Sequence, residues 1–430
     1  MATDLIASMV LAIWLYLIAA RGGFWRAADR DDAPLPKGLP KGLPKGLPKG
    51  LPKGLPKGLP MEPPEGGWPA VTAVIPARDE AECAGETVAS LLRQDYAGPF
   101  TVVLVDDQSR DATAQVARDA AVALGAADRL TVLSGRALPA GWTGKLWAQQ
   151  QGVELAGEAP RYLLLTDADI VYTPDALTSL VARAEPGGFV LTSLMAKLRC
   201  KSLAERFFVP AFIFFFQMLY PFGWANNPRR GTAAAAGGCM LVRREALRDA
   251  GGLAAIRGAL IDDCTLAKLL KRHGPIAITL TERVHSIRDY PAMADIRRMV
   301  SRTAYAQLRY SPLLLAGTVL GLALTYLAPV ALTIFARGVP QFVGLFVWLL
   351  MALAFRRTLR FYGLSILWAP LLPAIAAMYM AFTLDSAYQH ARGRGGMWKG
   401  RAQADLSDKS ADFSDKSADL SDRSNVSELR

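Results

Sequence analysis

Two aspartates one residue apart, Asp167 and Asp169, end the apolar run YLLLTDAD at residues 162–169. If residue 168 is extended, both side chains point to the same side of the chain, because side chains alternate along a strand. Two carboxylates placed so close repel each other, so a positive charge is expected between them. Carboxylate oxygens suit Mg²⁺ or Mn²⁺, and the pair therefore predicts a divalent-cation site.

Polar clusters also follow two other apolar runs. Arg78, Asp79 and Glu80 come soon after VTAVIP (71–76), and Asp106 and Asp107 end TVVLVDD (101–107). The carboxyl ends of parallel strands are where sheets of this kind bind ligands. We therefore expect these clusters to share one binding site.

A second acidic pair, Asp262 and Asp263, opens the helical pattern DDCTLAKLLKRHG. Carboxylates at the start of a helix cap its free amide groups. They can equally act as a general base toward a hydroxyl group. The sequence leaves both roles open.

The elements that position these residues alternate between strands and helices. Short apolar β-branched runs at 71–76, 101–107, 130–135 and 162–169 predict buried strands, and the patterns at 81–94 and 112–125 predict helices. Continuously apolar strands separated by helices are typical of a mostly parallel sheet that is covered on both faces. The predicted fold class is α/β.

Apolar runs outside this region predict a membrane protein. Hydrophobic residues make up 52% of the chain and charged residues only 20%. The predicted spans are an N-terminal anchor within 1–25 and two or three helices within 311–390, of which the stretch 339–355 is marginal and one is expected to be re-entrant. Residues 207–222 predict an interfacial helix or a membrane-facing groove, with a buried core helix as the alternative.

Two low-complexity segments flank the predicted domains. KGLP repeats six times at 37–60, within a predicted linker at 26–67, and three heptads occupy 405–425 of a tail (391–430) that is first basic and then expected to be disordered. Arg21, Arg26 and Arg30 follow the first span, so the positive-inside rule places the next domain in the cytoplasm.

Charge and metal-binding residue types restrict the possible partners. The formal net charge is +11, but no RNA-binding signature accompanies it, so we expect a membrane surface or a phosphorylated substrate and no nucleic acid. The four cysteines form no CxxC pair, and the three histidines have no ligand spacing. Zinc, disulfide and histidine-metal sites are therefore not expected.

Several motifs in order resemble the inverting, lipid-modifying family 2 glycosyltransferases, whose catalytic domain has the GT-A fold. The resemblance covers roughly residues 68–310. It rests on VIPARDEAE (74–82), VDDQSRDAT (105–113), GWTGKLWA (141–148), TDAD (166–169), GGCMLVRREAL (237–247) and IDDCTLAKLLKRHG (261–274).

The resemblance implies a role for each polar cluster. The nucleoside of a sugar nucleotide, usually uridine, would meet Arg78, Asp79, Glu80, Asp106 and Asp107. Lys145 would approach the donor phosphate, and Asp167 and Asp169 would hold the divalent cation, Mg²⁺ or Mn²⁺. Asp262 and Asp263 resemble the family's ED motif, and Asp263, in its second position, is the expected base.

The family's QxxRW motif has only an incomplete counterpart here. Arg302 is the residue expected to assist the diphosphate, and the segment Gln307-Leu308-Arg309-Tyr310 is a near match one residue short. This departure argues against a cellulose- or hyaluronan-type polymerase.

Within the family, the chain looks most like the bacterial hopanoid-associated glycosyltransferases, relatives of ceramide and carotenoid glucosyltransferases. The single N-terminal span, GWTGK, RTAYAQLRYSP (302–312) and WKGR (398–401) carry this resemblance. It implies a UDP-sugar donor and a membrane-lipid acceptor, at the cytoplasmic face of a bacterial inner membrane.

Two other functions compete with lipid glycosylation. A polyprenyl-phosphate sugar synthase would use an acceptor that is already ionised, and would not need Asp263 as a base. A membrane transporter or scaffold that senses nucleotide would bind without turnover. The second acidic pair and the lack of charge in the predicted spans before Asp385 argue against this last function.

Overall fold

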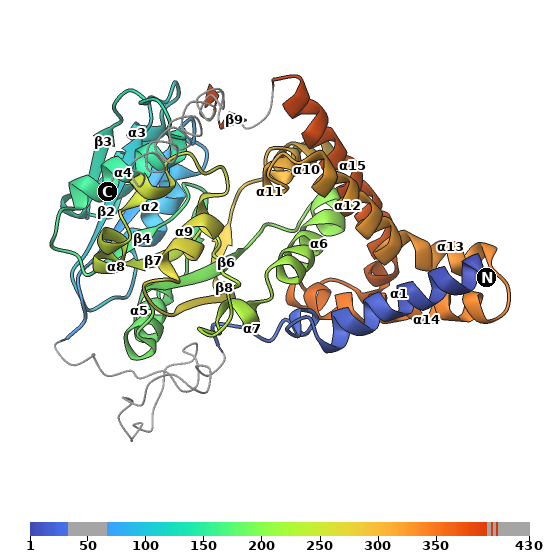
Figure 1. Ribbon diagram of the computed structural model, residues 1–430. Coiled ribbons are helices and arrows are strands. Elements are labelled where there is room, and N and C mark those ends of the chain that lie inside the picture. The colour runs from blue at the N-terminus through green and yellow to red at the C-terminus, as the bar shows by residue number, and fades with distance from the viewer. Residues whose placement is uncertain (33–66, 394–396, 399–400, 403–430) are drawn as a thin grey trace, which may run out of the picture.

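The computed structural model describes residues 1–32 and 67–393, together with the short strand pair β9 (Met397–Trp398) and β10 (Arg401–Ala402). It consists of a sheet with its covering helices beside a bundle of long helices (Figure 1). The KGLP repeat and the heptads of the tail lie outside the described residues.

An eight-stranded sheet forms the first part, in the order β3-β2-β1-β4-β7-β6-β8-β5. Strands β3, β2, β1 and β4 are parallel, β6 is parallel to β8, and the remaining pairings are antiparallel. This confirms the predicted mostly parallel α/β sheet. The strands are β1 (Val71–Ala77), β2 (Phe100–Asp106), β3 (Leu130–Ser134), β4 (Tyr162–Leu165), β5 (Ile170–Tyr172), β6 (Leu191–Lys197), β7 (Met240–Arg243) and β8 (Ile276–Ser286).

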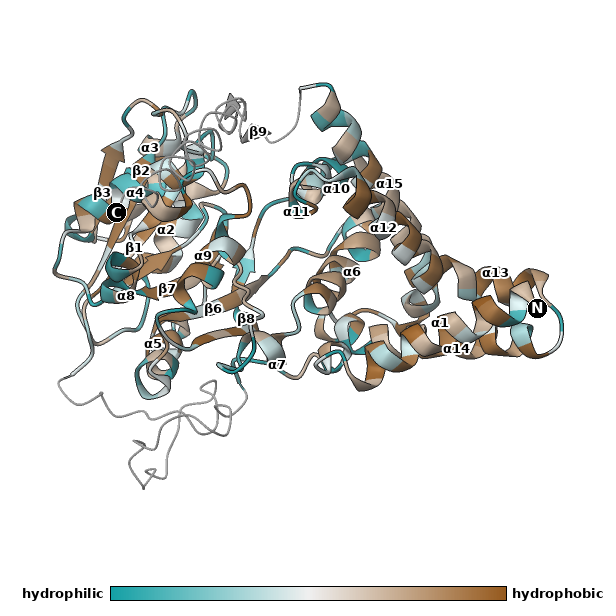
Figure 2. Ribbon diagram, in the orientation of Figure 1, coloured by the Kyte–Doolittle hydropathy of each residue, from teal (hydrophilic) through white to brown (hydrophobic). Residues whose placement is uncertain are grey.

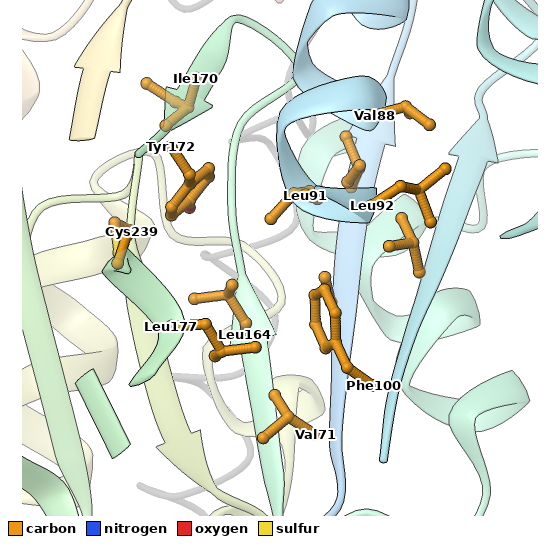
Figure 3. Close-up of a cluster of buried hydrophobic side chains, with 14 of the residues drawn as sticks. Val71, Val88, Leu91, Leu92, Phe100, Leu164, Ile170, Tyr172, Leu177 and Cys239 are labelled. Atoms are coloured by element: carbon orange, nitrogen blue, oxygen red, sulfur yellow. The ribbon is translucent and has the colours of Figure 1, made fainter. Parts of the chain in front are cut away.

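Helices cover both faces of the sheet, as the apolar strands predict. In β1, Ala73 and Ile75 enter the core beneath one set of helices, whereas Val74 enters the core on the other face, because side chains alternate along a strand. Figure 3 shows part of the first core, in which Leu164 and Leu177 lie near one another. The first face is covered by α2 (Ala84–Leu92), α3 (Thr113–Ala123) and α5 (Ala176–Gly187), and the second by α4 (Gly144–Ala156), α8 (Arg244–Asp249) and α9 (Asp262–Leu270).

Among the described residues, five helical segments are long and apolar enough to cross a membrane. Their brown colour in Figure 2 contrasts with the mixed colours of the sheet domain. The stretch at 339–355, which looked marginal in the sequence, belongs to a 23-residue helix. The candidates are α1 (Ala2–Ala19), α6 with α7 (Leu203–Leu219 and Phe222–Ala225), α12 with α13 (Pro312–Leu322 and Ala328–Phe335), α14 (Val339–Phe361), and the segment Ile366–Ala391, most of which is α15 (Leu372–Ala391).

Helix α6 packs inside the helical bundle. Phe208 and Phe214 are buried with Trp14 of α1 and Phe355 of α14 in one apolar cluster. Half of the apolar segment that includes α6 and α7 is buried, which fits the core-helix alternative better than a helix lying on a surface. Short helices α10 (Met293–Ser301) and α11 (Ala304–Gln307) connect the sheet domain to the later spans.

The segment after α1 joins the edge of the sheet domain. The Asp31 amide donates to the Leu280 carbonyl at 3.0 Å, and the Leu280 amide donates to the Asp29 carbonyl at 2.8 Å. The buried Asp31 carboxylate also accepts hydrogen bonds from Thr281 at 2.6 Å and Arg283 at 2.9 Å. The predicted linker begins at residue 26, but residues 29–31 are bound to β8.

Candidate active site

A cleft of about 1120 Å³ lies between the sheet domain and helices α10 and α15. Six of the residues singled out in the sequence line it, namely Glu80, Lys145, Asp167, Asp169, Asp262 and Arg302. Arg288, Tyr290, Ser301 and Asp385 line it as well. The structure therefore brings together polar clusters that are far apart along the chain.

The two loops expected to meet the nucleoside are bonded to each other. The Asp79 amide donates to Ser109 Oγ at 2.9 Å, and the Arg110 amide donates to the Asp79 carboxylate at 2.7 Å. Asp79 has a φ of +50°, a left-handed conformation that aspartate tolerates better than most residues. Asp106 accepts from the Ser109 amide at 3.0 Å, which fixes the turn that follows β2.

Arg78 and Asp107 connect these two loops inside the domain. Both side chains are buried, and Arg78 donates to the Asp107 carbonyl. The Arg78 guanidinium also lies 3.8 Å from the Asp107 carboxylate. These two residues support the loops from inside the domain, whereas Glu80 reaches the cleft.

Lys145 connects the two acidic pairs. Its Nζ lies 2.8 Å from Asp167 Oδ1 and 3.0 Å from Asp262 Oδ2. Burial acts to lower the pKa of Lys145, but Asp167 and Asp262 more than offset it, so the pKa lies above its usual value. Lys145 is therefore charged at neutral pH, at the start of α4, where an incoming phosphate would meet it.

Asp169 has different partners from Asp167. Its Oδ2 accepts hydrogen bonds from Ser286 Oγ at 2.9 Å and from Arg288 Nε at 3.1 Å. Residues 168 and 169 form a turn between β4 and β5, so the expectation of an extended residue 168 was wrong. The expected positive charge is present, but each carboxylate has its own cation, because the turn sends the two side chains to different neighbours.

Asp263 lies at the start of α9, behind Asp262. Its carboxylate accepts from the Gly237 amide at 3.0 Å and from its neighbour Cys264 at 2.6 Å. Desolvation and the nearby Asp262 raise the pKa of Asp263 to about 6, against the opposing effects of Lys145 and these amides. A Cβ on Gly237 would lie 3.1 Å from Lys145 Nζ and 3.6 Å from Asp263 Oδ2, so the backbone here passes close to both side chains.

Arg302 lines the cleft from the helical side, directly after α10. Its side chain is exposed. Gln307, from the competing motif, instead hydrogen-bonds Tyr220 at the end of α6. Of the two candidates, Arg302 is thus the one that faces the cleft.

The described residues contain no group of three His, Cys, Asp or Glu side chains that could hold a metal ion. Mg²⁺ in phosphate-transfer sites is commonly held by one or two carboxylates, with substrate phosphates and water supplying the remaining ligands. Asp167, about one-third exposed in the cleft, and Asp169 fit such an incomplete site. Their oxygen donors suit Mg²⁺ or Mn²⁺ rather than a soft metal.

Two residues at the site were not found from the sequence. Arg288 and Ser286 lie at the end of β8, whereas Gly237, which precedes β7, belongs to the quoted motif GGCMLVRREAL (237–247). Arg288 donates to both oxygens of Glu80 at 2.7 Å as well as to Asp169. The only available signal was the polar run SIRDY (286–290) at the end of an apolar strand.

Comparison with known sequences identifies the family of the sheet domain. The family described as "Glycosyltransferase like family 2" matches residues 69–288. None of the curated proteins matches the chain significantly.

Similar solved structures include three glycosyltransferases. A mannosyltransferase from Pyrobaculum calidifontis, in complex with GDP-Man and Mn²⁺, has a TM-score of 0.44 and 20% identity, covering 91% of this chain and all of its own. Glucosyl-3-phosphoglycerate synthase from Mycobacterium tuberculosis, with Mn²⁺, UDP-glucose and glycerol 3-phosphate, has a TM-score of 0.33 and 20% identity, covering 54% and 80%. TarS from S. aureus, with UDP-GlcNAc, has a TM-score of 0.35 and 13% identity, covering 76% and 92%.

Proposed function

The chain belongs to glycosyltransferase family 2, and from this premise we propose that it transfers a sugar from a nucleotide-sugar, in the first instance a UDP-sugar, to a membrane lipid. The α/β sheet domain is its GT-A catalytic domain. The anomeric carbon is inverted, because the attacking hydroxyl approaches from the face opposite the departing diphosphate.

The residues of the cleft divide this reaction between them. The loops 78–80 and 106–107 receive the nucleoside, with Glu80 as their residue in the cleft lining, and Lys145 and Arg302 offer positive charge to the diphosphate. Asp167 and Asp169 hold a divalent cation, which when bound neutralises charge on the leaving group. Asp263 accepts the proton of the acceptor hydroxyl, and its raised pKa of about 6 suits a base that works near neutral pH.

The observation that supports the lipid acceptor is the position of the cleft beside a membrane-span candidate. One wall is the charged end of the sheet, and the other is formed by α10 and the end of the membrane-span candidate α15. Ser301 of α10 donates to Asp385 of α15 at 2.9 Å, so the two helices form one wall. An acceptor that is anchored in a bilayer can reach the donor from this side.

The location and the lipid are further parts of the proposal. Arginines after the first span favour a catalytic domain on the cytoplasmic face of a bacterial inner membrane. The family motifs favour a hopanoid or a related lipid as the acceptor.

Incubation of the purified protein with radiolabelled sugar nucleotides, with and without total bacterial lipid, tests the function. We expect one preferred donor and a labelled product in the lipid phase. Product that is labile to mild acid would indicate a polyprenyl-phosphate acceptor instead. Nucleotide binding without turnover on any donor, in the presence of lipid, would favour the sensor function and contradict the proposal.

A further inference from the structure

Arg288 connects Glu80, in the loop proposed to receive the nucleoside, to Asp169, in the proposed metal site. Its Nη2 lies 2.7 Å from both oxygens of Glu80, and its Nε lies 3.1 Å from Asp169 Oδ2. Glu80 and Asp169 are buried, whereas the Arg288 side chain is 30% exposed and lines the cleft. The two carboxylates raise the pKa of Arg288 despite its partial burial.

Without this arginine, the donor end of the cleft would carry a large excess of negative charge. Glu80, Asp167, Asp169 and Asp262 line the cleft, and Lys145 is the cation bound between two of them. A nucleotide diphosphate is itself an anion, and like charges that are partly desolvated repel strongly. Lys145 and Arg302 offer positive charge elsewhere in the cleft, whereas Arg288 supplies it beside Glu80 and Asp169.

The backbone around Arg288 is held from the membrane side. The buried Glu205, near the start of α6, accepts from the Tyr290 amide at 2.9 Å and from the Ser202 amide at 2.8 Å. Ser202 Oγ in turn donates to the Tyr290 carbonyl at 3.1 Å, and Tyr290 packs against the apolar cluster of the bundle. The bundle thus fixes the strand end from which Arg288 reaches into the cleft.

We propose that Arg288 is a positioning residue that holds Glu80 and Asp169 in place and balances their negative charge. The cleft can then bind an anionic nucleotide-sugar both without the divalent cation and with it. This inference rests on the proposed function. It concerns the same cleft, but it assigns a role to a residue outside the family motifs quoted above.

Removal of the guanidinium should change the binding of cations and anions in opposite directions. In full-length Arg288→Ala, UDP-glucose or GDP-mannose added without metal should bind on the order of tenfold more weakly, and Mn²⁺ added alone should bind on the order of tenfold more tightly. Arg288→Lys should fall between the alanine variant and the native protein, because an ammonium keeps the charge but cannot bridge Glu80 and Asp169 through two nitrogens held in one plane. Calorimetric titration of each ligand, with an unfolding curve for each variant, measures these effects.

The control is Arg248→Ala, which removes an exposed arginine paired with Glu245 and Asp249 on α8, outside the cleft lining. It should leave both affinities unchanged. Unchanged affinities in Arg288→Ala, or weaker binding of both ligands, would overturn the inference, since a merely distorted site cannot bind Mn²⁺ more tightly. Failure of the native protein to bind either sugar nucleotide would contradict the proposed function, whereas the Mn²⁺ titration would still test the role of Arg288.

Discussion

The two loops proposed to receive the nucleoside (78–80 and 106–110, the nucleoside loops) and the two acidic pairs (Asp167 with Asp169 and Asp262 with Asp263, the acidic centre) are stabilised by different kinds of partner. Asp79 and Asp106 accept hydrogen bonds from backbone amides within the two loops themselves. Asp167 and Asp169 instead pair with side-chain cations from other elements, Lys145 and Arg288. The loops are therefore expected to tolerate loss of charge, whereas the acidic centre depends on its charge balance.

The largest expected effect is that of Asp263→Asn at the acidic centre. The amide cannot take a proton, and removal of a general base typically lowers the rate about a hundred- to ten-thousandfold. Donor affinity should persist. Lipid glycosylation by the variant, measured beside nucleotide titration, checks the prediction.

The native carboxylate accepts hydrogen bonds from two backbone amides, one at each oxygen. Asparagine has only one oxygen and loses one of these bonds, so the variant should also lose about 1 kcal/mol of folding stability. Asp262→Asn, with its partner Lys145, serves as the matched comparison. Near-normal transfer by Asp263→Asn would exclude it as the base, and would favour a capping role or an ionised phosphate acceptor.

The second expected effect concerns Asp169→Ala. Removal of one of the two carboxylate ligands should weaken the binding of the divalent cation, so Mn²⁺ should strengthen donor binding much less than in the native protein. The measurement is nucleotide-sugar titration with and without Mn²⁺. Retention of the full metal enhancement would contradict the assignment of Asp169 as a ligand.

The pH profile provides a third test of the acidic centre. The raised pKa of Asp263, about 6, means that the carboxyl takes up a proton as the pH falls through 6, and the base is then lost. We expect transfer to fall about tenfold per pH unit below 6 and to level off above it. In Asp263→Asn this step should be absent from the residual rate, and a step that persists there would belong to another group.

A smaller effect is expected for Asp106→Asn in the nucleoside loops. The amide oxygen can still accept from the Ser109 amide, so the turn after β2 should survive. Nucleotide affinity should weaken by less than about tenfold, the equivalent of 1.4 kcal/mol. A loss as large as that of Asp263→Asn would show that the two sides of the cleft do not differ in the way described.

The smallest expected effect is that of deleting the KGLP block, residues 37–60. The five candidate spans of the described residues and the contacts of residues 29–31 with β8 all lie outside this block, so activity and membrane association should stay largely unchanged. Transfer assays and membrane fractionation check this. Loss of both folding and activity would show that the repeat packs on the enzyme.

Features that depend on local bonds could be predicted from the sequence, whereas ion pairs between residues far apart in the chain could not. The strands, their covering helices and the loop clusters follow from local apolar patterns and turn residues, and the structure confirms the predicted sheet. Asp167 and Asp169 were recognised as a pair, but their turn was not, because strand propensity continues through the motif. Arg288 could not be assigned, since it is 208 residues from Glu80 and 119 from Asp169 in the chain.

Because residues 29–31 are bound to β8, the segment that follows them starts and ends on the same sheet. Asp31 is bound at one edge of the sheet, and the chain re-enters the same sheet at Val71. The sheet therefore sets the separation of Asp31 and Val71, whatever the number of KGLP units between them, and for the flexible linker predicted from the sequence a change in repeat number alters mainly the entropy of closing that loop. Doubling the length of a flexible loop costs only about 0.6 kcal/mol. Gain or loss of repeat units should thus be nearly neutral for the stability of this enzyme.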